Sequence, residues 1–137
     1  MVKKERKKMT GITRKITLDL ARRGNVRLIF ARQNDMNSRT VSIYLTNGGA
    51  PYFVDKDAVA IVNVVRPDGL IGAFNGDIED DGSISITLGA WTLGVKGEVK
   101  CSVSLFFEEE GKLTSADFYL DVEEAIDIGD GITEDER

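Results

Sequence analysis

Apolar and polar residues alternate along most of this chain with the two-residue period of β-strands. Between Ala58 and Val122 the alternation is interrupted at four glycine-containing turns, three of which also carry acidic residues: 67–69, 80–82, 94–97 and 110–111. Strands joined by such short turns form hairpins. The pattern therefore predicts an antiparallel sheet rather than a helical or βαβ fold.

Nine stretches have strand character: 16–20, 26–31, 41–46, 52–54, 58–66, 70–79, 84–88, 99–107 and 113–122. No stretch predicts an amphipathic helix longer than two turns. Eight or nine short strands within about 110 residues predict an all-β fold, an antiparallel two-sheet β-sandwich of the Ig-like or jelly-roll-like kind. The expected domain is 12–124, between a flexible basic arm at 1–11 and an acidic tail or linker at 125–137.

The stretch 58–66 is apolar on both faces of its expected strand, apart from Asn63. Two interpretations are open for it: a central strand covered on both sides, or a strand whose second face contacts a partner. The stretch 52–54 follows Pro51 and is expected at a sheet edge, where the N–H that proline lacks is not needed.

The formal net charge is -5, and the charges are unevenly distributed. Basic residues crowd the start and acidic residues crowd the end: Lys3, Lys4, Arg6, Lys7 and Lys8 against Asp121, Glu123, Glu124, Asp127, Asp130, Glu134, Asp135 and Glu136. A solvated basic arm is favoured over one that contacts nucleic acid or an acidic partner, because no aromatic residue is interleaved with the basic ones. No nucleic-acid partner is predicted, because the overall acidity would oppose phosphate binding outside the arm. No membrane partner is predicted, since no apolar run approaches the roughly 18 to 20 residues that span a bilayer.

Histidine is absent from the sequence, which excludes histidine-dependent nucleophiles, general bases and metal ligands. The single cysteine, Cys101, lies on the apolar parity of its strand, where a thiol is expected to be buried and unreactive. The adjacent acids Asp80 and Asp81, like those at 108–110, are typical of hairpin tips rather than of catalytic carboxylate pairs. No phosphate-binding glycine loop is present, and no cofactor is predicted.

Asp77, Glu79 and Asp81, followed by Gly82, resemble the first half of an EF-hand calcium loop. The twelfth position of such a loop needs a bidentate Glu, and Leu88 stands there. A hairpin turn that uses acidic residues and glycine is therefore favoured, and a weak surface cation site at the three acids is the alternative.

Trp91 is the only tryptophan and lies between Gly89 and Gly94, in a stretch that interrupts the strand pattern. It is a candidate stacking platform for a sugar ring or an anchor at a protein interface. The favoured interpretation is a plug that closes one end of the sandwich, because a lone tryptophan in a small β-domain usually covers core.

Five stretches follow one another in a distinctive order: Ile-Thr-Leu-Asp-Leu at 16–20, 41–49 ending in Thr-Asn-Gly-Gly, Val-Val-Arg-Pro-Asp-Gly at 64–69, Gly-Glu-Val-Lys-Cys-Ser-Val at 97–103 and Gly-Lys-Leu-Thr-Ser-Ala-Asp-Phe at 111–118. In this order and spacing the chain from Ile16 to Glu124 resembles the N-terminal domain family of phage baseplate upper proteins, which occurs in tailed phages and prophages of Gram-positive bacteria.

The resemblance implies a structural, non-enzymatic β-sandwich that docks onto the tail core and links it to receptor-binding components. It implies other phage tail and baseplate proteins as partners, a place in the virion tail baseplate, and synthesis in the cytoplasm of the host bacterium. The chain reaches Arg137 without the coiled-coil heptads that would drive trimerisation, so self-association is left open.

We expect the domain to dock onto a neighbouring tail subunit through an edge strand or a loop cluster. The oppositely charged ends of the chain would help to align this contact. The candidate anchors are Tyr52, Phe53, Trp91 and Leu93. The alternative function is a carbohydrate-binding β-sandwich, in which Trp91 and Tyr52 would stack against sugar rings.

Overall fold

A computed structural model describes residues 11–22, 28–109 and 111–126 of the chain. These residues form ten strands: β1 (Ile12–Asp19), β2 (Leu28–Arg32), β3 (Arg39–Asn47), β4 (Ala50–Tyr52), β5 (Val59–Val65), β6 (Ile71–Ile78), β7 (Ile84–Thr87), β8 (Gly97–Phe106), β9 (Lys112–Thr114) and β10 (Phe118–Glu123). The prediction of an all-β fold is confirmed. The described part of the chain includes no helix long and apolar enough to cross a membrane. Most of the expected basic arm and acidic tail falls outside the described residues.

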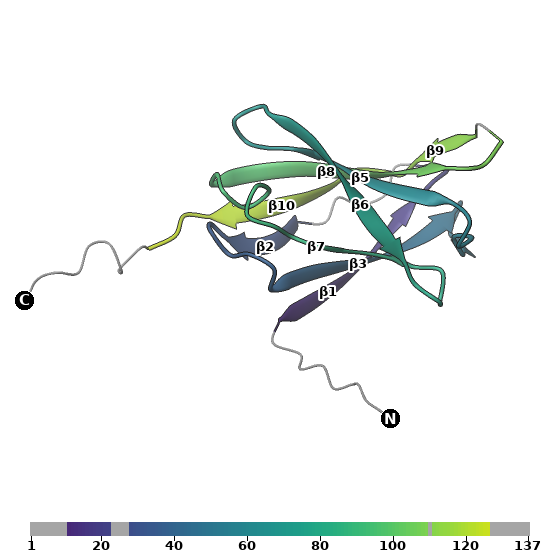
Figure 1. Ribbon diagram of the computed structural model, residues 1–137, viewed down its shortest axis with the longest axis horizontal. Helices are drawn as coiled ribbons and strands as arrows, with labels where there is room; N and C mark the ends of the chain where they lie inside the picture. Colours follow the sequence, from purple (N-terminus) through teal and green to yellow (C-terminus); the bar gives the residue numbers. More distant parts are fainter. Residues whose placement is uncertain (1–10, 23–27, 110, 127–137) are drawn as a thin grey trace, which may run out of the picture.

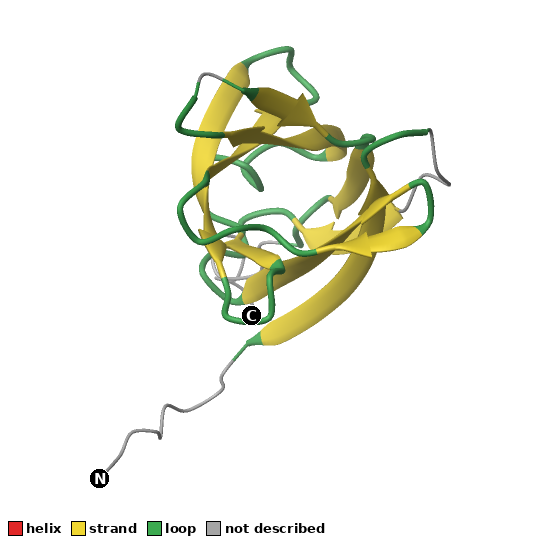
Figure 2. Cartoon of the chain, turned by 90° about the vertical axis from the view of Figure 1, so that its right-hand side faces the viewer, coloured by secondary structure: helices red, strands yellow, loops and turns green. Residues whose placement is uncertain are grey.

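The strands form one mixed sheet in the order β1-β3-β7-β6-β5-β8-β10-β2, with β4 beside β3 and β9 beside β8. β6 joins the two halves, because it pairs with β5 as far as Gly76 and with β7 from Asp77 onwards. The sheet curls almost into a barrel, and Figure 2 shows the strands arranged around a common centre. The predicted separation into two sheets is therefore not confirmed, and the strands number ten because a loop divides the stretch 113–122 into β9 and β10.

The sheet is not wholly antiparallel, which corrects the prediction from sequence. β1 runs parallel to β3, and β2 runs parallel to β10, whereas the other neighbours are antiparallel. Parallel neighbours cannot be joined by a tight hairpin. The chain leaves β1, passes through β2 on the far end of the strand order, and then returns to place β3 beside β1 (Figure 1).

Inward-facing apolar side chains of the strands fill the core. Alternate residues of the longer strands β1, β3, β5, β8 and β10 supply most of the core, such as Ile16 and Leu18 in β1 and Val99, Cys101 and Val103 in β8. This is the parity that the sequence pattern predicts, and burial of such side chains is the main favourable term in folding.

β5 lies in the middle of the sheet, between β6 and β8, as expected of a central strand. Its inward residues Ala60, Val62 and Val64 are buried, whereas Val59 on its other parity is 53% exposed. The other residues of that parity, Ile61, Asn63 and Val65, are partly buried. The central position of the stretch 58–66 is therefore confirmed, and its outer face is covered only in part by described residues.

The turns use glycine where the sequence indicates. Gly48 and Gly49 follow β3 with φ values of 62° and 95°, in the left-handed region that other residues rarely adopt. A Cβ atom on Gly82 would lie 2.8 Å from the Cβ of Phe53, so this turn also needs glycine for close packing against the end of β4.

Candidate interaction surfaces

The four predicted anchor residues do not form one cluster. Tyr52 and Phe53 lie at the end of β4, next to the turn that follows β6, because Val54 N donates a hydrogen bond to Gly82 O at 3.1 Å. Trp91 instead packs beside Gly72, near the start of β6. The structure therefore separates the anchors into two regions at opposite ends of β6.

Trp91 is held in a stack of its own. The guanidinium carbon of Arg66 lies 4.6 Å from the centre of its ring, and the Phe74 ring is tilted against it with centroids 5.5 Å apart. Arg66 also donates from Nη1 to Trp91 O at 3.2 Å and from Nε to Asp68 Oδ1 at 3.1 Å. A Cβ on Gly72 would come within 2.8 Å of the indole ring.

This stack favours the interpretation of Trp91 as a plug over that of a stacking platform for a sugar. The side chain is half-buried against the core, and Arg66 occupies the ring surface that a sugar would need for stacking. The hydrogen bond from Arg66 lowers the pKa of Asp68, so the ion pair that positions the guanidinium is stable at neutral pH.

Leu93 is fully buried, with 0% of its side chain and backbone surface exposed. Its N–H donates to Gly89 O and its carbonyl accepts from Asn34 N, so the segment around it is fixed on both sides. Leu93 offers no exposed surface to a partner, and its selection as an anchor is therefore wrong. Sequence alone placed it next to Trp91 without indicating that the two side chains face different environments.

Tyr52 and Phe53 form the more accessible of the two regions. Phe53 is 73% exposed, whereas Tyr52 is half-buried against the core. A hollow of about 210 Å³ lies beside them, lined also by Thr17, Tyr44 and Gly82. An exposed phenylalanine at the rim of a partly apolar hollow is typical of a protein contact site.

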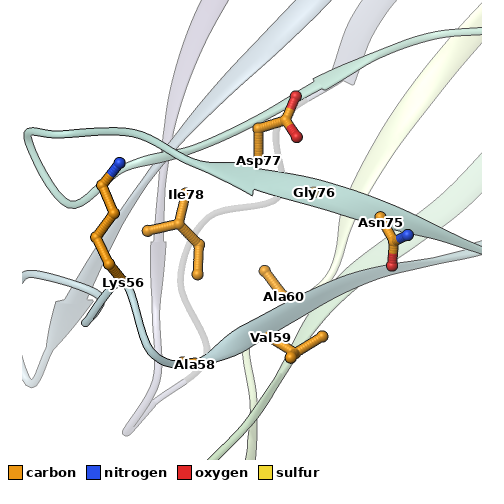
Figure 3. A pocket seen from close by; sticks show the side chains of 8 residues that line it. All are labelled: Lys56, Ala58, Val59, Ala60, Asn75, Gly76, Asp77 and Ile78. Atoms are coloured by element: carbon orange, nitrogen blue, oxygen red, sulfur yellow. The ribbon is translucent and has the colours of Figure 1, made fainter.

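A second hollow, of about 380 Å³, opens between β5 and β6 where the two strands separate. Their pairing ends at Ala60 and Gly76, and beyond this point β6 turns to pair with β7. Figure 3 shows Ile78 reaching into the space between the strands and Asp77 directed away from it. The hollow holds no convergent set of polar groups, so its shape indicates no particular ligand.

The three acids of the calcium-like stretch do not converge. Glu79 Oε2 accepts a hydrogen bond from Ser85 Oγ, and Asp81 Oδ1 accepts from Ser83 N at 3.0 Å and from Ser83 Oγ at 2.6 Å. The two bonds from Ser83 lower the pKa of Asp81 and engage its carboxylate within the turn. Within 11–22, 28–109 and 111–126 no group of three or more potential ligands could hold a metal, so the weak cation site raised by Asp77, Glu79 and Asp81 is not formed.

Cys101 lies in the core on β8 and is 2% exposed, which confirms the prediction from parity. Burial, with a smaller contribution from the charge of Asp117, raises the pKa of its thiol to about 12. A thiol so protonated is a poor nucleophile.

Asp19, at the end of β1, has a structural role that the sequence did not reveal. Its carboxylate accepts hydrogen bonds from Thr46 Oγ1 at 2.6 Å and from the N–H groups of Ala21 and Arg22, both at 2.8 Å. It also accepts from the N–H groups of the Gly48–Gly49 turn. Five donors on one carboxylate hold two turns together, and the one signal in the sequence was an acid placed directly before a turn.

Comparisons with known proteins give the family. The profile of the BppU N-terminal domain matches residues 12–137 of the chain. Among solved structures the fold is similar to "N-terminal domain of phage TP901-1 ORF48", with a TM-score of 0.65 and 16% identity over 82% of this chain and 98% of that chain.

A likeness to fibronectin(III)-like modules of Clostridium thermocellum CbhA has a TM-score of 0.43 and 15% identity, over 80% of this chain and 96% of that chain, and is too weak to indicate a shared fold. A search of curated protein sequences found no match. Because the profile covers nearly the whole described fold, the chain belongs to the BppU N-terminal domain family of all-β structural domains from phage baseplates.

Proposed function

We propose that this domain is an assembly module of a phage or prophage tail baseplate. It docks by protein–protein contacts and links the tail core to receptor-binding components. The observation that carries the proposal is the family match over residues 12–137. The sequence supports it, because a chain without histidine offers few of the usual routes to catalysis.

The proposed docking surface is the region of Tyr52 and Phe53. Phe53 exposes most of a large apolar side chain beside a hollow that a partner could fill. Burying such a side chain at an interface contributes about 1.5 to 3 kcal/mol. Trp91 is not included, since its ring already packs against Arg66 and Phe74.

The partners proposed are other tail and baseplate proteins of the same phage. The domain would act in the virion tail baseplate after synthesis in the cytoplasm of the host bacterium. Neither nucleic acid nor a membrane is proposed as a partner, because the chain is acidic overall and a phosphate surface would repel it.

The experiment is reconstitution with the tail proteins of the same phage. The full chain is co-expressed with each baseplate protein in turn, complexes are sized by light scattering after gel filtration, and affinities are measured by calorimetry. We expect a stable complex with at least one of them, weakened by about tenfold or more in Phe53→Ser. The matched control is Met36→Ser, since Met36 is 58% exposed in the loop between β2 and β3.

Failure to bind any baseplate protein would overturn the assembly role. A complex that forms equally well with Phe53→Ser would leave the assembly role in place and remove Phe53 from the interface. A complex weakened equally by both variants would indicate general destabilisation rather than a local contact.

A further inference from the structure

β1 is the terminal strand of the sheet, and among the described residues it pairs with β3 alone. Two backbone hydrogen bonds, one at the first residue of β1 and one at the residue that follows its last, identify the groups that face β3. Ile12 N donates to Ser38 O at 2.8 Å, and Leu20 N donates to Thr46 O at 2.7 Å. The even-numbered residues of β1 therefore direct their N–H groups towards β3.

Successive residues of a strand direct their backbone groups to opposite edges. The N–H and C=O groups of Thr13, Lys15 and Thr17 consequently face away from β3. The carbonyl of Asp19 follows the same rule, since it accepts from Ala116 N at 3.1 Å on that side. Ala116 covers only the last residue of the strand, and no other described residue pairs with this edge.

Over most of its length this free edge of β1 has no cover from residues 11–22, 28–109 or 111–126. The first four residues of β1 are exposed on both faces, and Thr17 is exposed as well. Ile12 is 60% exposed although it lies on the apolar parity. A row of unpaired backbone donors and acceptors in an extended strand is a template for another strand.

The charges of β1 select which strand it can accept. Arg14 and Lys15 are both exposed, one on each face of the strand near its middle. Antiparallel pairing with β1 of a second copy would bring these cations close to one another, and like charges across a strand pair are destabilising. A strand with carboxylates at the facing positions would instead pair favourably with them.

We propose that the free edge of β1 is a strand-addition site for an extended, acidic segment of a partner protein. The added strand would receive hydrogen bonds from the outward N–H groups of β1 and donate to its outward carbonyls. Arg14 and Lys15 would bind its acidic side chains on the two faces of the extended sheet. This goes beyond docking through Phe53, and either contact can fail while the other holds.

The probe is a capped peptide of about eight residues, the length of an ordinary strand, built of Val and Thr with Glu at pairs of adjacent positions. Adjacent Glu residues place carboxylates on both faces of the added strand. Its matched control has Lys in place of every Glu. Binding to the full-length chain is followed by NMR, together with the exchange rates of individual β1 amides. We expect the acidic peptide to bind at least about tenfold more tightly than the basic one. It should slow exchange at Thr13 and Lys15, whereas Ile16 is already protected by β3.

Two variants separate backbone pairing from charge. Thr13→Pro removes a free-edge N–H without breaking a bond to β3, so it should leave the fold intact and weaken the acidic peptide about tenfold. The double variant Arg14→Glu with Lys15→Glu should reverse the preference and favour the basic peptide. Phe53→Ser should leave peptide binding unchanged, which keeps this result independent of the proposed docking surface.

The proposal would be overturned if neither peptide binds at its highest soluble concentration, or if both bind alike. It would also be overturned if the amide protons of Thr13 and Lys15 exchange as slowly in the free protein as that of Ile16, because the edge would then already be covered. Self-association of a variant with Arg14 and Lys15 both changed to Thr, without any binding of the acidic peptide to the unchanged chain, would assign the two cations only a protective role.

Discussion

Thr46 Oγ1 donates a hydrogen bond of 2.6 Å to Asp19 Oδ1 across the parallel pair of β1 and β3. The two residues are direct neighbours in the register, although β2 separates them in the sequence. The same carboxylate binds the backbone of the turns that follow both strands. Because these bonds stabilise the ionised form, with the Thr46 bond as the largest contribution, they lower the pKa of Asp19 far below its ordinary value.

Replacing Asp19 by Asn should destabilise the domain. Both oxygens of the carboxylate accept hydrogen bonds, whereas the side-chain nitrogen of Asn can only donate, so some of the five donors would lose their acceptor. We expect the melting temperature of Asp19→Asn to fall by roughly 5 °C or more. Asp77→Asn is the matched control, since Asp77 is exposed and makes no salt bridge with another described residue. Equal melting temperatures for the two variants, measured by circular dichroism, would contradict this role.

The stability of the domain should fall on acidification, because several carboxylates are stabilised in their ionised form by the fold. Asp19, Asp68 and Asp81 all have a lowered pKa in the folded state, whereas in the unfolded chain an aspartate titrates near 3.8. The unfolded state therefore binds protons first as the pH falls. The stabilisation is fully present above the ordinary pKa and is lost progressively as the pH falls below it.

Urea unfolding over a series of pH values measures this effect. The free energy of unfolding should be nearly constant above the ordinary aspartate pKa of 3.8 and decline below it. Asp19→Asn should decline less steeply, since one of the contributing groups is missing. An identical pH dependence in the variant would show that Asp19 titrates alike in the folded and unfolded states.

Trp91 should report directly on its stack, because it is the only tryptophan in the chain. Removing the guanidinium in Arg66→Ala exposes one face of the indole, so its fluorescence emission should move to longer wavelength. Arg32→Ala is a matched control, since Arg32 lies over the ring of Phe30 at 5.5 Å instead. An unchanged emission maximum in Arg66→Ala would contradict the stacked geometry.

Truncation of the same residue tests its role as a plug. Trp91→Ala leaves Gly72 and Phe74 without their packing partner, and we expect a loss of about 2 to 3 kcal/mol in the free energy of unfolding. The expected cost is below that of a fully buried tryptophan because Trp91 is only partly buried. A variant as stable as the unchanged chain would show that Trp91 is free to serve a partner.

The strands could be predicted from sequence because their signal is local. The alternation of Val99, Cys101 and Val103 is visible within one strand and requires no knowledge of its neighbours. The turn at 67–69 was likewise marked by its own residues. These features gave nearly every strand and most of the core.

The features that could not be predicted from sequence depend on pairing between segments that are distant along the chain. Nothing near Asp19 indicates that Thr46 lies beside it, because β1 and β3 become neighbours only when β2 crosses to the other end of the sheet. The parallel pairs and the curled sheet share this origin. The burial of Leu93 has the same origin, since it is set by the segments packed around it and not by its neighbours in sequence.

Cys101 should be inert towards thiol reagents in the folded protein. Its pKa of about 12 leaves almost no thiolate at neutral pH, and the residue is 2% exposed on β8. We expect its reaction with an aromatic disulfide to be at least about 100-fold slower in the native state than in urea. The control is Lys100→Cys in a Cys101→Ala background, which moves the thiol one residue along the strand to the exposed face and should react readily. Rapid native labelling of Cys101 would mean that β8 separates from its neighbours often enough to expose the core, which would contradict its stable packing.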